Sequence, residues 1–437
     1  MIKHILYFEW KNIKRSKIVI WTAVILSLLI FLSIHTGNLA VKNQLDDIKK
    51  IKQEEKERHE KLLTDIEKVD AGEKKVNAYT NPKTPYMVGG KYGSYDIFKE
   101  PEELSFISMG QSDFFPYHYR ISVRNRQLYS FLAGDDRMEN PLNQQNSNFD
   151  LAFVLIWLLP LFVITFSYNI LSSEKEFGTL KLLKASSVSI TKILLAKILL
   201  RFIIITSITT VSILLLFYLY GVNISDNISG ISKLFLFICA YTLFWFLISA
   251  IVNLFSKSSI VNAGIMFAVW LLLIITVPAI LNIVSNYKYP VATRIEYVNF
   301  IREATYEIDN NSDKVLDEYF LSHPELGTRK SENMPFWVYK NALKNKIIKD
   351  VSGNFVNHRN SQFNKQIEFI NNFKYLSPAI VMQQALDKIS GNSTSDFLKF
   401  QAEADECNDK WRMYFFPKIL RDELMSKNDV LNLPKYR

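Results

Sequence analysis

Cysteine and histidine are scarce in this chain, and neither forms the pattern of a metal or redox site. The two cysteines are Cys239, inside an apolar run, and Cys407, in a polar stretch, so we expect no disulfide between them and no metal site. The six histidines are scattered and make no ligand pair at helical spacing. We interpret them as ordinary surface or interface residues, and we expect no bound cofactor.

Catalytic motifs are also missing. The sequence has no Gly-x-x-x-x-Gly-Lys-Ser/Thr phosphate loop, no Gly-x-Ser-x-Gly nucleophile elbow and no His-Glu-x-x-His zinc motif. Adjacent carboxylates, such as Glu102 with Glu103 and Asp135 with Asp136, fit solvated positions on a surface. We therefore expect that the chain is not an enzyme and does not hydrolyse ATP by itself.

Charge is nearly absent from five long windows, although 22% of the 437 residues are charged and 49% are hydrophobic. The charged residues gather in 41–75, 293–350 and 399–435. The formal net charge of +9 is compatible with nucleic acid or with an anionic membrane surface as a partner. No basic stripe interleaved with aromatic residues occurs in a polar stretch, so we expect contact with lipid and not with nucleic acid.

The five windows of low charge are apolar runs close to or beyond the length of a membrane-spanning helix. A spanning helix needs about 20 mostly apolar residues, and five such runs are not typical of buried helices in a soluble protein. The sequence therefore predicts a mainly α, polytopic helical membrane protein. Its predicted spans are residues 18–35, 149–171, 193–220, 231–255 and 260–284.

Basic residues around the first run predict the orientation. Lys14, Arg15 and Lys17 precede it, and the positive-inside rule then places the N-terminus in the cytoplasm. Residues 1–17 combine apolar and basic positions at helical spacing, as in an amphipathic helix that lies in the cytoplasmic membrane interface. We expect a multi-pass protein of the cell (inner or plasma) membrane.

Two long polar regions, 36–148 and 285–437, are extracytoplasmic in this topology and are predicted to be mostly helical. Residues 39–69 carry a sparse apolar stripe that indicates a long helix or a helical hairpin. Residues 79–101 are rich in proline, glycine and tyrosine, which indicates loop and short strands.

Polar residues within the spans are few. Lys197 and Arg201 lie near the start of the third run, where they can extend to the membrane surface. Asn253 and Asn262 are interpreted as partners in helix–helix hydrogen bonds. Pro160 is expected to kink the second span. No charged residue lies in the middle of a run, so no proton relay is predicted.

The loop 172–192 between the second and third spans reads SSEKEFGTLKLLKASSVSITK and is cytoplasmic in this topology. Its sequence predicts a turn followed by a short amphipathic helix, with glycine giving backbone freedom and threonine able to cap the helix start. A short helix of this kind, held outside the membrane, is a docking element. Its candidate residues are Glu174, Glu176, Gly178, Thr179, Leu180, Leu182 and Leu183.

Three stretches resemble the ABC-2 type permeases of ABC transporters. The loop resembles the family signature EKE-x-GTL … LL … P-V-S … GK. Residues 110–116 resemble an external GQSD-x-x-P element, and residues 377–379, with Phe400 beyond them, resemble an SPA … F element. The matching external residues are Gly110, Gln111, Asp113, Pro116, Ser377 and Pro378. The two external elements resemble the subgroup with large extracytoplasmic insertions, which includes the permeases of nitrous-oxide-reductase maturation and gliding-type permeases.

The resemblance implies six spans, an interfacial helix at 1–17 and a coupling helix within 172–192. It implies that this loop docks on cytoplasmic ABC ATPase subunits and that two permeases work as a homodimer or heterodimer. Glu174 and Glu176 would then pair with basic groups on the ATPase, while Leu180, Leu182 and Leu183 bury in its groove.

The chain departs from the family pattern in two places. Ser187 stands where the signature has proline, which affects the exit geometry of the loop. A sixth apolar run does not follow the fifth, so the chain is either truncated or a five-span variant. We expect truncation, which a longer reading frame ending in an apolar run of about 20 residues would confirm.

Two functions from different classes fit the sequence. The first is the membrane-spanning permease subunit of an ABC transporter, an exporter driven by a separate cytoplasmic ATPase. The second is a membrane-anchored extracytoplasmic binding or sensor protein, which predicts that deletion of residues 173–184 leaves function intact. A membrane enzyme is a weaker third alternative, because no catalytic constellation is present. The sequence does not identify a substrate.

Overall fold

The computed structural model describes residues 2–15, 17–110, 115–124, 129, 149–179, 189–255, 258–322, 324 and 333–435. These residues are mostly helical, and five of their helices are long and apolar enough to cross a membrane. The predicted fold class, a polytopic helical membrane protein, is therefore confirmed. The five helical stretches are Ile18–Asp70, Leu151–Glu176, Ile190–Leu219, Ile228–Phe255 and Ser259–Lys288.

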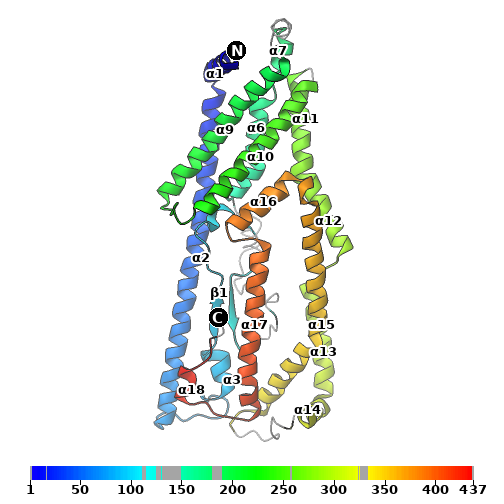
Figure 1. Cartoon of the computed structure of the whole chain (residues 1–437). Coiled ribbons are helices and arrows are strands. Elements are labelled where there is room, and N and C mark those ends of the chain that lie inside the picture. The colour runs from blue at the N-terminus through cyan, green and yellow to red at the C-terminus, as the bar shows by residue number, and fades with distance from the viewer. Residues whose placement is uncertain are drawn as a thin grey trace.

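The apolar helices form one bundle, at the top of Figure 1. The N-terminal helix α1 (Ile2–Arg15) lies at the upper end of this bundle, beside α9, and α7 reaches the same end. We call this end the loop end. The bundle elements are the first part of α2 (Ile18–Asp70), α5 (Leu151–Phe153), η4 (Val154–Leu158), α6 (Leu159–Ser167), α7 (Ser172–Glu176), α9 (Ile190–Leu219), α10 (Ile228–Phe255), α11 (Ser259–Trp270), η5 (Leu271–Thr276) and α12 (Val277–Lys288).

Helix α2 is continuous over 53 residues, so residues 39–69 form one long helix and not a hairpin. At 1.5 Å per residue it is about 80 Å long, far more than the roughly 30 Å of a hydrocarbon core. Its N-terminal part packs against α9 in the bundle, and its C-terminal part packs against the first strand and α18. This one helix therefore joins the bundle to the polar part of the protein.

Pro160 and Pro278, the two prolines of the five apolar stretches, each lie just after a π-helical turn. The π-helix η4 ends two residues before Pro160, and the π-helix η5 ends two residues before Pro278. Proline has no N–H for the carbonyl four residues earlier, so carbonyls in these turns need other donors. Tyr241 Oη donates to the Ile156 carbonyl at 2.8 Å. The expected irregularity at Pro160 is thus a widened turn whose freed carbonyl is satisfied by a neighbouring helix.

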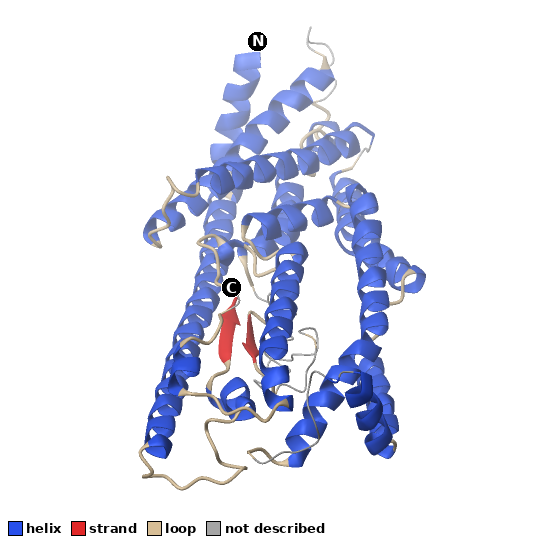
Figure 2. Cartoon of the chain, turned by 60° about the horizontal axis from the view of Figure 1, so that its bottom comes forward, coloured by secondary structure: helices blue, strands red, loops and turns tan. Residues whose placement is uncertain are grey.

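The second compact part, called the polar region below, lies beneath the bundle in Figure 1. It holds the C-terminal part of α2, a two-stranded antiparallel sheet and the elements after α12. Figure 2 shows the two strands lying between long helices, and α2 contacts β1 while α17 contacts β2. Its further elements are α3 (Pro85–Met87), η1 (Val88–Tyr92), β1 (Tyr95–Phe98), η2 (Ser105–Ile107), β2 (His118–Ile121), α13 (Arg294–Asn310), α14 (Ser312–Ser322), α15 (Phe336–Phe373), η7 (Lys374–Leu376), α16 (Pro378–Ile389), α17 (Thr394–Leu420) and α18 (Lys427–Leu431).

Local sequence signals set the starts of several helices in this region. Thr293, Ser393 and Ser426 are N-cap residues, and each makes a capping box with an acidic residue three positions later. The buried side chains Trp411 and Phe415 of α17 contribute to a second apolar core, separate from that of the bundle. The polar region therefore has a core of its own, consistent with a folded unit and not a set of loops.

Candidate functional site

At the loop end, four charged side chains form one ion-paired group. Glu9 of α1 accepts hydrogen bonds from Arg201 of α9, at 2.7 Å from Nη2 and 3.1 Å from Nε, and lies 3.6 Å from Lys197 Nζ. Lys197 Nζ also donates to Glu174 Oε1 at 2.8 Å. The Lys197 and Arg201 side chains are only 13% and 15% exposed, and both end in ion pairs within the chain.

This group fixes the base of the predicted docking loop to two helices. Breaking a buried ion pair by removing one partner costs about 3–5 kcal/mol, because it leaves an uncompensated charge. Glu174 is further held by the hydroxyl of Thr179, which donates to its carboxylate. Thr179 therefore bonds backward to α7. The group ties α1, α7 and α9 together at one end of the bundle.

Glu176 makes a second anchor for the same loop. Its carboxylate accepts hydrogen bonds from the Ser259 backbone N–H at 2.7 Å and from Ser259 Oγ at 2.9 Å. Ser259 begins α11, so the carboxylate satisfies a free N–H at a helix start. Gly178 follows at φ +73°, a left-handed position that ends α7 and that glycine adopts at little cost. Phe177, between them, is 81% exposed.

The predicted apolar docking residues Leu180, Leu182 and Leu183 lie outside the described residues. Gln111 and Asp113 of the second motif also lie outside them. The roles predicted for these five residues stay predictions. What the structure describes on the loop is its base, where both glutamates contact groups of this chain.

Two asparagines support the irregular stretch between α6 and α7. Asn253 Nδ2 donates to the Ser167 carbonyl at 3.0 Å, and Asn253 Oδ1 accepts from the Leu171 backbone N–H at 3.2 Å. Asn262 Nδ2 donates to the Tyr168 carbonyl at 2.8 Å. These bonds replace the helical ones that the stretch lacks, as buried irregular backbone in a membrane protein requires. Both asparagines therefore make the helix–helix contacts that the sequence predicts.

At the opposite end of the bundle, residues 108–110 pack against the end of α16 and the turn between α16 and α17. We call this contact the junction. Gly110 has φ +53°, and a Cβ atom on it would lie 2.5 Å from the Asn392 carbonyl oxygen. Asn392 Nδ2 donates to the Ser108 carbonyl at 2.8 Å, and Ser108 Oγ donates to Asp387 Oδ1 at 2.6 Å. Only glycine fits this close approach in this conformation.

Two carboxylates are central to this junction. Asp387 is 6% exposed, and burial raises its pKa to about 6, with a further contribution from nearby Asp150. Asp150 accepts from the Phe153 N–H at 2.8 Å, so it caps the start of α5, and it also accepts from the Met109 N–H at 2.9 Å. The junction therefore holds the first turn of the helical stretch Leu151–Glu176.

The third motif also contacts the bundle. Ser377 is fully buried, and its Oγ donates to the Leu273 carbonyl at 2.6 Å, inside the π-helix before Pro278. Pro378 occupies the first position of α16, where its missing N–H costs no helical bond. Pro116 is half-buried just before β2 and does not belong to the junction.

The structure thus brings motif residues from distant parts of the chain to the two ends of one helical stretch. Leu151–Glu176 carries Glu174 and Glu176 at the loop end and follows Asp150 at the junction. Its most apolar window is 61% buried, against 17% for Ser259–Lys288, so it lies at the centre of the bundle. This stretch therefore connects the loop end with the junction.

Sequence reasoning missed three acidic residues at these two ends: Glu9, Asp150 and Asp387. Glu9 is the only acidic residue among residues 1–17, which are otherwise apolar, polar or basic. This isolated position was the one sequence signal that its carboxylate pairs with another part of the chain. Asp150 is the second residue of the run 149–171 and precedes its uninterrupted apolar part, where an aspartate is a common N-cap. Asp387 has no comparable local signal.

The chain was compared with curated proteins, solved structures and protein-family profiles. No curated protein and no solved structure matches the chain. The profile of the family described as ABC-2 family transporter protein matches residues 4–405, which include both ends of the bundle and most of the polar region. Members of this family are membrane components of transport systems, in agreement with the five apolar helices. The chain belongs to the ABC-2 transporter family.

Proposed function

We propose that the protein is the membrane-spanning permease subunit of an ABC transporter that works as an exporter, driven by a separate cytoplasmic ATPase. Its N-terminus and loop end face the cytoplasm, and the polar region is extracytoplasmic, in the cell membrane. The observation that carries the proposal is the rigidly anchored loop base, where Glu174 and Glu176 are bonded to α9 and α11. A loop that receives force from a partner needs such a base.

The anchoring changes the division of roles proposed for the loop. Because both glutamates are engaged within the chain, we propose that they position the loop, while Leu180, Leu182 and Leu183 supply the contact with the ATPase. The exposed Phe177 offers a further apolar contact to the ATPase. Buried apolar anchors contribute most of the affinity of a typical interface, and exposed charge pairs contribute about 0–1 kcal/mol.

We further propose that two permeases associate, as a homodimer or with a related chain. The stretch Ser259–Lys288 is the least buried of the five, and it exposes large apolar side chains such as Ile260, Ile283 and Val284. The remaining apolar surface contacts lipid. We also place the chain in the subgroup with large extracytoplasmic insertions, because a separately cored polar region interrupts the spans.

The experiment is co-purification of the tagged chain after mild solubilisation, followed by identification of bound proteins. We expect an ABC ATPase subunit with the wild type, its loss with Leu183→Asp, and weaker loss with Glu174→Gln. Deletion of 173–184 should abolish transport. If no ATPase is recovered while the chain remains folded, and the deletion leaves function intact, the permease proposal is wrong and the extracytoplasmic binding or sensor function takes its place.

A further inference from the structure

The end of α15 and the start of α16 meet at a corner that lies beside the bundle and not beneath it. We call residues 373–377, which include the 3-10 helix η7, the corner. Figure 1 shows α15 rising beside α12 to the level of the bundle, and α16 leading from there down to the start of α17. The corner therefore lies at the level of the apolar helices, although it belongs to the long polar stretch 285–437.

Two contacts fix the path of α15 along α12. Gln366 Nε2 donates to Asn286 Oδ1 at 3.0 Å and to the Tyr289 carbonyl at 2.6 Å, at the end of α12. Further along the chain, Ser377 Oγ donates to the Leu273 carbonyl at 2.6 Å, inside η5. The end of α15 therefore runs antiparallel to α12, and the corner lies farther into the bundle than the end of α12 does.

Leu273 indicates the depth of the corner in the membrane. The stretch Ser259–Lys288 has 30 residues, and at 1.5 Å per residue it is about 45 Å long, close to the thickness of a bilayer with its headgroup regions. Leu273 is halfway along this stretch, so it lies within the hydrocarbon layer of roughly 30 Å. A tilt of the helix shortens these lengths along the membrane normal but leaves Leu273 between the two ends. The corner that contacts Leu273 is thus at the depth of lipid.

The side chains of the corner suit contact with lipid. Tyr375 and Leu376 are 78% and 57% exposed, and Phe373 beside them is exposed as well. Tyrosine is enriched where a membrane protein meets the headgroups, because its ring is apolar and its hydroxyl is polar. The backbone of the corner is irregular, but Ser377 is buried and its N–H donates to the Lys374 carbonyl at 3.1 Å. Irregular backbone is tolerated at membrane depth when its polar groups are satisfied in this way.

Two lysines lie beside aromatic rings around the corner. Lys374 Nζ is 5.4 Å from the centroid of the Tyr375 ring, and Lys288 Nζ, at the end of α12, is 5.9 Å from the centroid of the Phe369 ring. A long lysine side chain can keep its methylene groups along an apolar surface while its ammonium group reaches the headgroups. The lysines are therefore placed to contact lipid phosphates.

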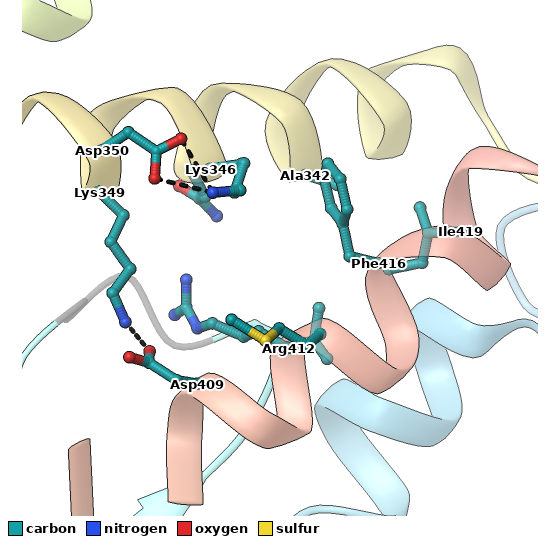
Figure 3. A pocket seen from close by; sticks show the side chains of 11 residues that line it. Ala342, Lys346, Lys349, Asp350, Asp409, Arg412, Phe416 and Ile419 are labelled. Carbon is teal, nitrogen blue, oxygen red and sulfur yellow. Dashed lines mark hydrogen bonds and ion pairs between the residues drawn. The ribbon is translucent and has the colours of Figure 1, made fainter. Parts of the chain in front are cut away.

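Helix α15 connects the corner with the core of the polar region. It is continuous over 38 residues, which corresponds to about 57 Å. Near its start, Val338 and Tyr339 belong to the apolar core of the polar region. Figure 3 shows that its middle part meets α17 at the ion pair between Lys349 and Asp409. One end of this helix is thus fixed in the polar region, and the other end reaches the corner.

We propose that the corner binds the bilayer and so attaches the polar region to the membrane surface. Phe373, Tyr375 and Leu376 lie among the lipids of the leaflet on the side of the polar region. Lys288 and Lys374 contact the phosphate groups of the same lipids. The inference depends on the membrane-spanning bundle and not on an ATPase partner or on the direction of transport, so it can fail while the proposed permease function holds.

The test is the depth of a nitroxide spin label at position 375 of the full chain in phosphatidylcholine nanodiscs. Tyr375→Cys is made in a chain whose Cys239 and Cys407 are replaced by alanine. Electron paramagnetic resonance then compares collisions of the label with oxygen, which concentrates in lipid, and with a water-soluble nickel chelate. Two equally exposed positions calibrate the measurement: Leu236→Cys in the apolar helix α10 and Tyr306→Cys in α13 of the polar region.

We expect collisions with oxygen to dominate at position 375 as they do at 236, and collisions with the nickel chelate to dominate at 306. Leu376→Cys is a second label position and should give the same result as 375. Both replaced side chains are largely exposed, so folding should be retained, and thermal unfolding of the labelled chains verifies it.

Two results would overturn the proposal. If the nickel chelate dominates at 375 and 376, the corner lies in water. If neither reagent reaches the labels, another protein surface, such as a second copy of the chain, covers the corner in place of lipid.

Discussion

Asp387 of the junction is a buried carboxylate whose ionisation opposes folding, and Asp387→Asn tests this directly. Its Oδ1 accepts hydrogen bonds from Ser108 Oγ at 2.6 Å and from Gln383 Nε2 at 2.7 Å. An asparagine oxygen can accept both bonds, so the substitution removes the charge and keeps the acceptor. The nearby Asp150, a second carboxylate, makes the removal of this charge more favourable.

The sign and size of the effect follow from the pKa. Burial raises the pKa of Asp387 from 3.8 to about 6, so the folded chain binds this proton more tightly than the unfolded chain. The stability from this group is therefore fully present below about pH 4 and is lost as the pH rises through about 6. A difference of about two pKa units corresponds to roughly 3 kcal/mol. The Asp387→Asn variant should gain that much on the wild type over this range.

The assay is thermal unfolding in detergent from about pH 4 to about pH 8, followed by the fluorescence of the seven tryptophans. The Tm of the variant minus the Tm of the wild type should rise by about 6–12 °C across the range, since about 1 kcal/mol shifts the Tm of a domain of 150–250 residues by 2–4 °C. Asp46→Asn gives the background effect of removing one exposed carboxylate. A Tm difference that stays constant with pH would refute the reasoning.

Three further substitutions probe the two ends of the bundle. Gly110→Ala should destabilise the chain by about 1–3 kcal/mol, because residue 110 has a positive φ and its Cβ would lie 2.5 Å from the Asn392 carbonyl oxygen. Gly264→Ala is the control, because open space surrounds Gly264 and no loss of stability is expected. Thermal unfolding of the two variants measures the difference. Ser377→Ala leaves the Leu273 carbonyl without its donor and should cost about 1–3 kcal/mol, measured in the same way. Glu9→Gln should cost about 3–5 kcal/mol and reduce ATPase co-purification, and an added Arg201→Gln should restore part of the stability.

The fold class was predictable because its signals are local. An apolar run of spanning length identifies a bundle helix whatever it packs against, and Ser393 and Asp396 form the capping box that starts α17 within four residues of sequence. The long helix α2 was one of two predicted alternatives, and the apolar stripe of 39–69 alone did not exclude a hairpin. Its straight continuation buries Leu62 and Ile66 in the core of the polar region.

The two ends of the bundle were not predictable in the same way, because they consist of long-range pairs. Glu9 and Arg201 are 192 positions apart, and Ser108 and Asp387 are 279 apart. No sequence periodicity connects such residues. A lysine or arginine near the end of a spanning helix is equally compatible with a side chain that extends to the membrane surface and with one that forms an ion pair. The sequence therefore did not reveal that Lys197 pairs with two carboxylates.

The helical stretch Leu151–Glu176 connects the two ends of the bundle at which described motif residues lie. The π-helix η4 of this stretch lacks the regular helical hydrogen bonds. Tyr241 of α10 donates to the Ile156 carbonyl there, and Trp270 of α11 donates to the Trp157 carbonyl, so both helices hold the π-helical turn in place. Under the proposed function, movement of the loop base would then pass along this stretch as a shift of packed helices. At the other end of the stretch, Asp150 contacts the segment before Gly110 and so binds the stretch to the polar region. Under the proposed function, force applied at the loop end would reach the polar region through this connection.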